Sequence, residues 1–185
     1  MKFFKIFIII FISLTSSIKA DSQKKLINEL KEGGKLIFIR HAYAPGNGDP
    51  ENFDIKDCST QRNLNEQGIE QSKKIGQFFT RNQIIFNKIF SSEWCRCKDT
   101  AKYAFNEFIT FDALNSFYQA KFLKNKDRKI KDLKKFIKTW DDNKNLILIT
   151  HYVVISEMLG VGVSSGEIIV SDKNYNIIDR IEISY

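Results

Sequence analysis

The sequence is poor in residues that bind metal ions or act as thiol nucleophiles. Its 185 residues include two His and three Cys, with no HExxH motif and no CxxC pair, which are common spacings of zinc ligands. The C-x5-R loop of cysteine phosphatases is absent too, which disfavours a cysteine nucleophile. We therefore expect no metal and no cofactor, and chemistry that needs imidazole must use His41, His151 or both.

Glycine and proline are also scarce, with nine and two residues, while 43% of the chain is hydrophobic and 13% is aromatic. This composition argues against a collagen-like or wholly disordered chain, because it supplies ample material for a core. No internal repeat or low-complexity linker divides the sequence, and its length suits one domain.

The first 20 residues have the pattern of a secretory signal peptide. Lys2 and Lys5 precede the apolar run Ile6–Leu14, which only Ser13 interrupts, and Ala20 closes a short polar stretch. Because the run is shorter than the roughly 20 residues that span a bilayer, it favours a cleaved signal over an uncleaved membrane anchor. We expect a mature domain of residues 21–185 that is periplasmic or secreted, and that is a monomer or a homodimer.

The net charge of +7 comes mainly from two segments, the signal peptide and residues 121–138. The second segment carries nine Lys or Arg against two Asp, and Ile130, Leu133 and Ile137 recur in it at helical spacing. We predict an amphipathic helix whose lysine-rich face is solvated; weak association with anionic substrates or an anionic membrane surface is the alternative. No nucleic-acid-binding motif is present, so we expect no nucleic-acid partner.

Short apolar runs alternate with amphipathic segments along the chain. This order predicts an α/β fold, a three-layer α/β/α sandwich with a mostly parallel central sheet. We expect an irregular segment at 109–119 and a long functional loop at 42–60. The predicted strands are 35–40, 88–91 and 145–150, with a hairpin of 167–171 and 177–184; the predicted helices are 24–31, 65–82, 98–108, 121–138 and 153–159.

Basic side chains follow the predicted strands where those strands end. Arg40 and His41 close the first strand, Arg96 lies shortly after the second, and His151 follows the third. Ligands of open α/β sheets bind beyond the carboxyl ends of the strands, so these side chains should meet at one edge. Guanidinium groups match phosphate oxygens, and imidazole can act both as nucleophile and as proton carrier. The cluster therefore predicts a phosphoryl-transfer site.

Four sequence blocks, in the same order, resemble those of the histidine phosphatase superfamily, the phosphoglycerate-mutase-like phosphatases. LIFIRHA (Leu36–Ala42) resembles the Arg-His-Gly signature, and NLNEQGIEQS (Asn63–Ser72) looks like the family's L-T-x-x-G-x-x-Q-A helix start. SSEWCRCKDTA (Ser91–Ala101) is similar to S-S-P-x-x-R-x-x-x-T-A, and LITHYVVI (Leu148–Ile155) to the V-x-H-G block. From the first block to the last, they extend over residues 36–155, which is most of the predicted mature chain.

The resemblance implies a role for each basic residue at the strand ends. His41 would be the nucleophile that forms a phosphohistidine, and Arg40 and Arg96 would hold the phosphoryl oxygens. His151 would donate to those oxygens from the other side. The implied activity is that of a histidine acid-type phosphatase that hydrolyses a small phosphomonoester, such as a sugar phosphate. A phosphohistidine phosphatase and a non-catalytic anion-binding module of the same fold are the alternatives.

Two further residues would bind substrate, and one residue departs from the family pattern. Asn47 lies where mutase-type members carry a phosphate-contacting Asn, and Arg62 would reach the rim of the pocket or lie on the surface. The family glycine after the nucleophile is Ala42 here, which is harmless if its φ is negative and costly if its φ is positive.

The proton donor to the leaving group is the least determined part of the site. An ester alcohol leaves poorly without a general acid, and the family places its carboxylate variably. Glu93 is the first candidate, and Asp112 and Glu157 are weaker ones. For all three, a surface salt bridge is the competing interpretation.

Cysteine usage agrees with export, since an oxidising compartment permits disulfides. A bridge from Cys58 to Cys95 or to Cys97 would connect the long loop to the segment of Arg96. If the backbone around Arg96 is extended, only one of the two cysteines can point toward Cys58. Three free thiols are the alternative.

Overall fold

The structure is a computed structural model that describes residues 23–141 and 143–185. The predicted signal peptide, residues 1–20, lies outside the described residues. In the part of the chain that is described, no helix combines the length and the apolar composition needed to cross a bilayer.

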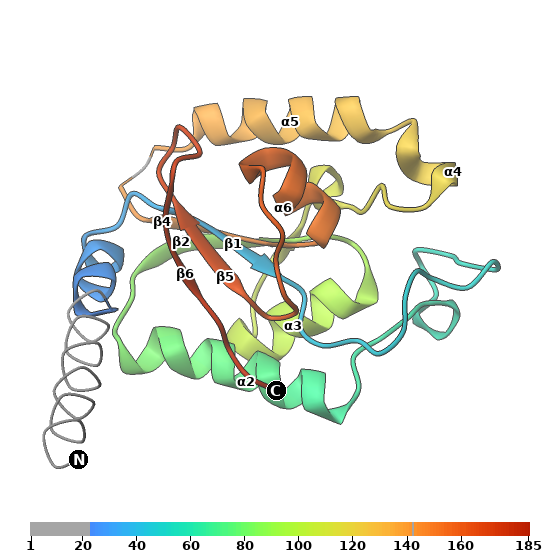
Figure 1. The fold of residues 1–185 in the computed structure, drawn as a ribbon, viewed down its shortest axis with the longest axis horizontal. Helices are drawn as coiled ribbons and strands as arrows, with labels where there is room; N and C mark the ends of the chain where they lie inside the picture. Colours follow the sequence, from blue (N-terminus) through green and yellow to red (C-terminus); the bar gives the residue numbers. More distant parts are fainter. Residues whose placement is uncertain (1–22, 142) are drawn as a thin grey trace, which may run out of the picture.

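A six-stranded sheet forms the centre of the molecule (Figure 1). Its strand order is β3-β2-β4-β1-β5-β6. The first four of these strands are parallel, β5 pairs antiparallel with β1, and β6 pairs antiparallel with β5. The strands are β1 (Leu36–Arg40), β2 (Phe86–Ser91), β3 (Ile109–Thr110), β4 (Asn145–Thr150), β5 (Ile168–Ser171) and β6 (Ile177–Ile181).

Helices cover both faces of this sheet. Figure 1 shows α5 and α6 on one face and α2 and α3 on the other. The predicted α/β/α sandwich with a mostly parallel sheet is thereby confirmed. The helices are 23–32, α2 (Glu66–Arg81), α3 (Cys95–Phe105), α4 (Ala120–Leu123), α5 (Lys126–Thr139) and α6 (Tyr152–Leu159), with 3-10 turns η1 (Cys58–Thr60) and η2 (Asp112–Leu114).

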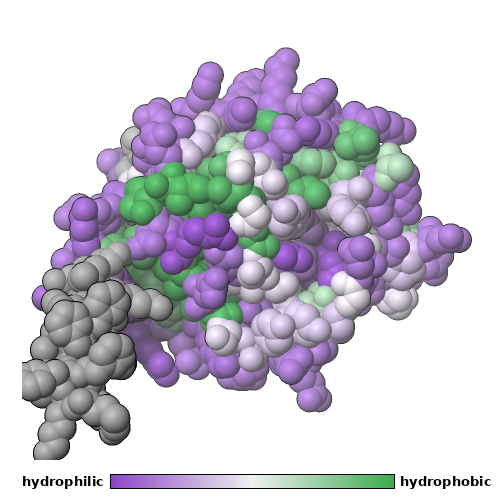
Figure 2. Space-filling model, in the orientation of Figure 1, coloured by the Kyte–Doolittle hydropathy of each residue, from purple (hydrophilic) through white to green (hydrophobic). Residues whose placement is uncertain are grey.

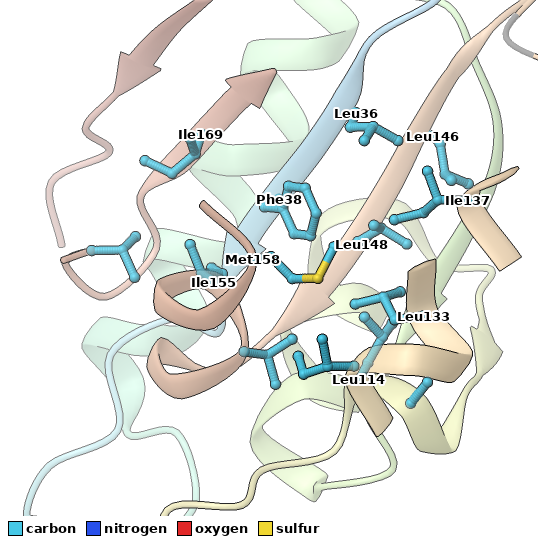
Figure 3. Packing of buried hydrophobic residues seen from close by; sticks show 14 of the residues in the cluster. Leu36, Phe38, Leu114, Leu133, Ile137, Leu146, Leu148, Ile155, Met158 and Ile169 are labelled. Carbon is cyan, nitrogen blue, oxygen red and sulfur yellow. The ribbon is translucent and has the colours of Figure 1, made fainter. Parts of the chain in front are cut away.

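The two central strands, β1 and β4, are apolar on both faces because each face packs against helices. Phe38 and Leu148 point toward α5 and α6, where they join Leu133 of α5 and Met158 of α6 (Figure 3). Ile37 and its alternate neighbours belong to the core on the α2 and α3 side. Successive side chains of a strand point to opposite faces, so a continuous apolar run predicts this double burial.

Both ends of α3 lie three residues before the predicted ones. The helix predicted at 98–108 begins three residues earlier, because the backbone N–H groups of Cys97 and Lys98 already bond to the carbonyl of Trp94. It ends at Phe105, since Asn106 has a left-handed φ of 70°. Arg96 therefore lies in the first turn of a helix and not on an extended backbone.

The predicted basic helix is two helices. Lys124 and Asn125 separate α4 from α5, and the lysine-rich outer side of α5 is solvated, as the hydrophilic side chains along that edge show (Figure 2). The segment 109–119, predicted to be irregular, contains the short strand β3 and the turn η2. Strand β3 consists of two residues, too few to give an alternating pattern in the sequence.

Candidate active site

The carboxyl ends of β1 and β4 bring the two histidines together. The strands are neighbours in parallel register, and the backbone N–H of His41 donates to the carbonyl of Thr150 over 2.9 Å. The imidazole centroids of His41 and His151 lie 5.4 Å apart with nearly perpendicular rings. Both side chains are almost fully buried, at 2% and 3% exposure. The structure therefore brings the two histidines together at one edge of the sheet.

Arg96 connects the two imidazoles from the first turn of α3. Its Nε donates to Nε2 of His41 over 3.2 Å, and its NH2 lies 3.5 Å from Nδ1 of His151. One edge of the guanidinium group thus faces both histidines. A phosphoryl group placed between the rings would meet two donors of one planar fork.

Arg40 approaches from the end of β1. Its NH1 donates to the carbonyl of Val163 over 2.8 Å, which fixes the side chain. Its Nε is buried and has no hydrogen-bond partner. Buried donors are rarely left unpaired, so this N–H group indicates a place for an acceptor.

These residues line a cavity of about 220 Å³. Ligand pockets for drug-sized molecules are larger, on the order of 300 to 1,000 Å³. The cavity therefore suits a small group or one end of a larger molecule. Its lining consists of Arg40, His41, Asn47, Gly48, Asp49, Arg62, Trp94, Arg96, Ser116, Tyr118, Gln119, Phe122, His151, Tyr152 and Val153.

The nucleophile candidate, His41, is held in one tautomer. Its Nδ1 lies 2.8 Å from the carbonyl of Ala42, and because a carbonyl only accepts, Nδ1 carries the proton. Nε2 therefore carries the lone pair, which accepts from Nε of Arg96. Burial and the charge of Arg96 lower the pKa of His41 well below its usual value. The imidazole is thus neutral, as a nucleophile requires.

Asn47 and Arg62 both line the cavity, and of the two places considered for Arg62 the structure has the pocket. The Asn47 side-chain amide donates to the Tyr118 hydroxyl over 3.3 Å, at the rim. Arg62 Nε donates to the carbonyl of Gly48 over 2.9 Å, and its NH1 donates to the carbonyl of Ala44. Burial and the charge of Arg96 lower the pKa of Arg62 to about 10, so it stays cationic at neutral pH.

Asp49 belongs to the site although no sequence pattern points to it. Its two carboxylate oxygens accept from NH1 and NH2 of Arg96 over 2.7 and 3.2 Å, and from Nε1 of Trp94 over 3.1 Å. Burial alone would raise the pKa of Asp49, but the hydrogen bonds and charge of Arg96 outweigh it and hold that pKa below its usual value. The carboxylate is ionised at neutral pH and fixes the far edge of the guanidinium group.

The three carboxylates considered as proton donors lie outside the cavity lining. Glu93 accepts from the amide of Asn115 over 2.6 Å. Asp112 pairs with Lys129 over 2.6 Å, and Glu157 pairs with Lys126 over 2.8 Å. In this structure each of the three is engaged with another side chain.

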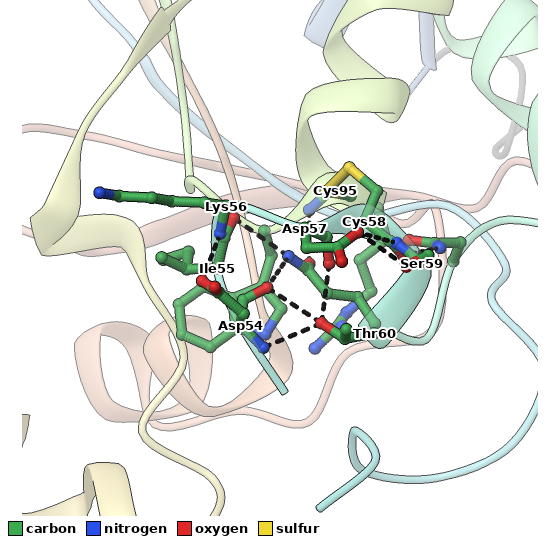
Figure 4. The surroundings of a disulfide bond; sticks show 12 residues. Asp54, Ile55, Lys56, Asp57, Cys58, Ser59, Thr60 and Cys95 are labelled. Atoms are coloured by element: carbon green, nitrogen blue, oxygen red, sulfur yellow. Dashed lines mark hydrogen bonds between the residues drawn. A yellow bond between two sulfur atoms is a disulfide. The ribbon is translucent and has the colours of Figure 1, made fainter. Parts of the chain in front are cut away.

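A disulfide ties the long loop to the helix of Arg96. Cys58 in η1 is bonded to Cys95, the first residue of α3, with the Cα atoms 5.7 Å apart (Figure 4). Of the two open pairings, the structure has Cys58–Cys95. Cys97 is free and buried, and its sulfur lies against the carbonyl of Thr150 and Nε2 of His151. The helical turn, not strand alternation, separates the directions of the two thiols.

Ala42 fits where the family carries glycine. It is not among the residues with a positive φ, and its side chain is fully buried. Its backbone N–H donates to Oγ1 of Thr100 over 2.9 Å. The methyl group is therefore accommodated without backbone strain.

Comparison with protein families gives one match. A family model described as histidine phosphatase superfamily, branch 1, matches residues 36–145. This range contains three of the four sequence blocks and ends at the first residue of β4, the strand that precedes His151. No curated protein sequence matches the chain.

Several solved structures share the fold. A SixA protein of Agrobacterium tumefaciens has a TM-score of 0.57 and 19% identity, over 80% of this chain and 98% of that one. The protein histidine phosphatase SixA complexed with tungstate has a TM-score of 0.55 and 12% identity, over 81% and 96%. An Entamoeba histolytica phosphoserine phosphatase mutant with bound phosphoserine has a TM-score of 0.53 and 19% identity, over 74% and 89%. At these low identities, the TM-scores establish a common fold and no more.

Proposed function

Because the chain belongs to branch 1 of the histidine phosphatase superfamily, we propose that it hydrolyses a small phosphomonoester through a covalent phosphohistidine at His41. One observation carries this proposal. Three arginines and two neutral imidazoles converge on one small cavity whose single carboxylate, among the described lining residues, is Asp49. The net charge of the site matches a phosphoryl dianion.

The first chemical step forms a bond between Nε2 of His41 and phosphorus. The bond from phosphorus to the ester oxygen breaks, its electron pair leaves with that oxygen, and the oxygen takes up a proton from solvent water to give the alcohol. The charge that spreads over the phosphoryl oxygens is stabilised by donors fixed beforehand, Arg96 on one side and Arg40 on the other. The unpaired Nε–H of Arg40 supports this role.

The second step returns the enzyme to its starting state. Water attacks the phosphohistidine, the bond from Nε2 to phosphorus breaks, and inorganic phosphate leaves. His41 again has a lone pair on Nε2, since the Ala42 carbonyl keeps the proton on Nδ1 throughout. Because the pKa of His41 is lowered, its imidazole stays neutral at pH values where a free histidine is protonated. We therefore expect turnover to continue into mildly acidic solution.

The rim of the cavity is where the rest of the substrate lies. Tyr118 and Tyr152 line the cavity and are still 58% and 45% exposed. Exposed aromatic rings at a pocket mouth offer apolar contact and a hydroxyl group to a leaving group. The phosphate end is deep and charged, and the leaving-group end is open and aromatic.

The test is phosphate release by the purified protein from an activated aryl phosphate, an alkyl phosphate, a sugar phosphate and a phosphohistidine peptide. We expect turnover that His41→Ala abolishes, and an acid-labile phosphoryl label on wild type after rapid quenching. Arg81→Ala is the control and should turn over as wild type does, since Arg81 is exposed at the end of α2 and lies outside the cavity lining. If wild type and His41→Ala are equally inert with every substrate from acidic to neutral pH, the phosphatase proposal is wrong. Phosphate binding without turnover would instead indicate the anion-binding module.

A further inference from the structure

Ser92 and Asn115 form a hydrogen-bonded chain behind His151, outside the cavity lining. The hydroxyl oxygen of Ser92 lies 2.9 Å from Oδ1 of Asn115 and 2.9 Å from Nε2 of His151. All three side chains are buried. These hydrogen bonds therefore connect the imidazole of His151 to the segment that follows η2.

The orientation of the Asn115 amide is fixed by its other partners. Its Oδ1 accepts from the backbone N–H of Glu93 over 2.8 Å. Its Nδ2 donates to the carboxylates of Glu93 and Asp112 over 2.6 and 3.1 Å. A backbone N–H only donates and an ionised carboxylate only accepts, so the amide oxygen has to face Ser92.

This orientation determines the tautomer of His151. Since Oδ1 of Asn115 cannot donate, the one hydroxyl hydrogen of Ser92 goes to it, and the Ser92 oxygen is left to accept from His151. The proton of the neutral imidazole is therefore on Nε2, and Nδ1 carries a lone pair. Arg96 agrees with this assignment, because its NH2 donor lies 3.5 Å from Nδ1. His41 and His151 are thus held in opposite tautomers.

Resting on the proposed function, we propose that Ser92 and Asn115 are positioning residues that keep Nδ1 of His151 unprotonated, so that the phosphoryl group binds together with one shared proton. A lone pair that faces the oxygen of a dianion gives repulsion, whereas a proton between them gives a hydrogen bond. The proton arrives from solvent or as the P–OH of a monoanion. It leaves with inorganic phosphate, so nothing is left over after turnover.

The groups around His151 explain why the proton arrives only with the phosphoryl group. Burial and then the charge of Arg96 lower the pKa of His151 well below its usual value. Two negative charges placed in the cavity offset that cationic field. The titratable and charged groups facing His151 are Arg40 and His41 at the end of β1, Asp49 and Arg62 in the loop, and Arg96 and Cys97 in α3.

The tautomer can be measured in the ligand-free protein. Nitrogen-15 NMR distinguishes the two tautomers of an imidazole, and the chain has two histidines, so each signal can be assigned with His41→Ala. We expect the proton on Nδ1 of His41 and on Nε2 of His151 at neutral pH. A proton on Nδ1 of His151 in the free protein would overturn the proposal. This measurement needs neither turnover nor a variant at the network.

The shared proton can be counted by calorimetry. Inorganic phosphate is titrated into the purified protein at about pH 8, above the second ionisation of a phosphate, in buffers of different ionisation enthalpy. We expect uptake of about one proton in wild type, set by linkage between binding and protonation. Asn115→Leu frees the Ser92 hydroxyl to donate to Nε2 of His151, and Ser92→Ala removes the oxygen that accepts from that nitrogen. In both variants Nδ1 is no longer kept unprotonated, so the proton uptake on phosphate binding falls toward zero.

Ser91→Ala is the matched control, because Ser91 is an equally buried neighbour whose hydroxyl donates to the Ser92 carbonyl and does not contact His151. Its proton uptake should equal that of wild type. If wild type binds phosphate without taking up a proton, the shared-proton proposal is wrong and the proposed function is not affected. A protein that neither binds phosphate nor releases it contradicts the proposed function, and the NMR measurement then decides the tautomer separately.

Discussion

At the scale of single residues, the site depends on how the five N–H groups of Arg96 are divided. Asp49 takes the outer edge of the guanidinium group, and the two histidines face the inner edge. The carboxylate therefore competes for no donor that a phosphoryl group between the imidazoles would use. Asp49 therefore orients the guanidinium group of Arg96 and leaves its inner edge open to a phosphoryl group.

Asp49→Asn should weaken phosphate binding without changing the fold. An amide offers one acceptor where the carboxylate offers two, so Arg96 loses one of its two outer hydrogen bonds and its charge partner. Hydrogen bonds to charged groups contribute on the order of 1.5 to 3 kcal/mol, so we expect a loss of about tenfold to a hundredfold in phosphate affinity. Calorimetric titration with inorganic phosphate measures it.

Glu51→Gln is the control for that variant, since Glu51 is an exposed acid in the same loop. Equal affinity of Asp49→Asn and wild type would show that Arg96 is held without Asp49.

The sequence identifies the histidines and arginines of the site but not Asp49. Strand ends and family motifs place His41, His151, Arg40 and Arg96, because short apolar runs determine where strands end. Asp49 lies in a loop without periodicity, and its contact with Arg96 spans 47 residues. A contact of that kind depends on the path of the loop, which no local pattern encodes.

At the scale of elements, the first turn of α3 joins three functions. It presents Arg96 to the histidines, bonds Cys95 to η1, and places Cys97 against the end of β4. The sequence predicted a helix here but began it after these residues. The boundary is set by bonds to the Trp94 carbonyl, which are not apparent from side-chain pattern.

Removal of the disulfide should destabilise the protein and loosen the loop. The bridge spans 37 residues, and closing a loop of that size stabilises a fold by about 2 to 4 kcal/mol through the unfolded chain. We expect Cys58→Ser to lose that much free energy of unfolding in urea. Reductant should lower the free energy of unfolding of wild type by the same amount and leave that of Cys58→Ser unchanged, so the variant is the control for the effect of reductant. An unchanged midpoint in reduced wild type would contradict this prediction.

At the scale of the whole molecule, export and cleavage remain predictions from the N-terminal sequence. Fractionation of the source cell should recover a shortened form, lacking roughly the first 20 residues, outside the cytoplasm and in the soluble fraction. Mass spectrometry of the mature N-terminus near Asp21 measures the cut. Recovery of the full-length chain in the membrane fraction would contradict cleavage.

The lysine-rich side of α5 is part of the same question. A high-salt wash of the membranes separates weak ionic association from a true anchor, because salt screens exposed charges. Release by salt would support the alternative of weak association with an anionic surface, whereas resistance to salt would argue for an uncleaved apolar segment.

The cavity has two ends that are built in different ways. The ends of β1 and β4 and the first turn of α3 hold the phosphate end, whereas the rim comes from the loop with Asn47, from Tyr118 and from the start of α6. Residues of the rim can therefore be substituted without moving His41 or Arg96. A chain of this design can therefore acquire new substrates through drift in its loops while selection preserves a single phosphoryl chemistry.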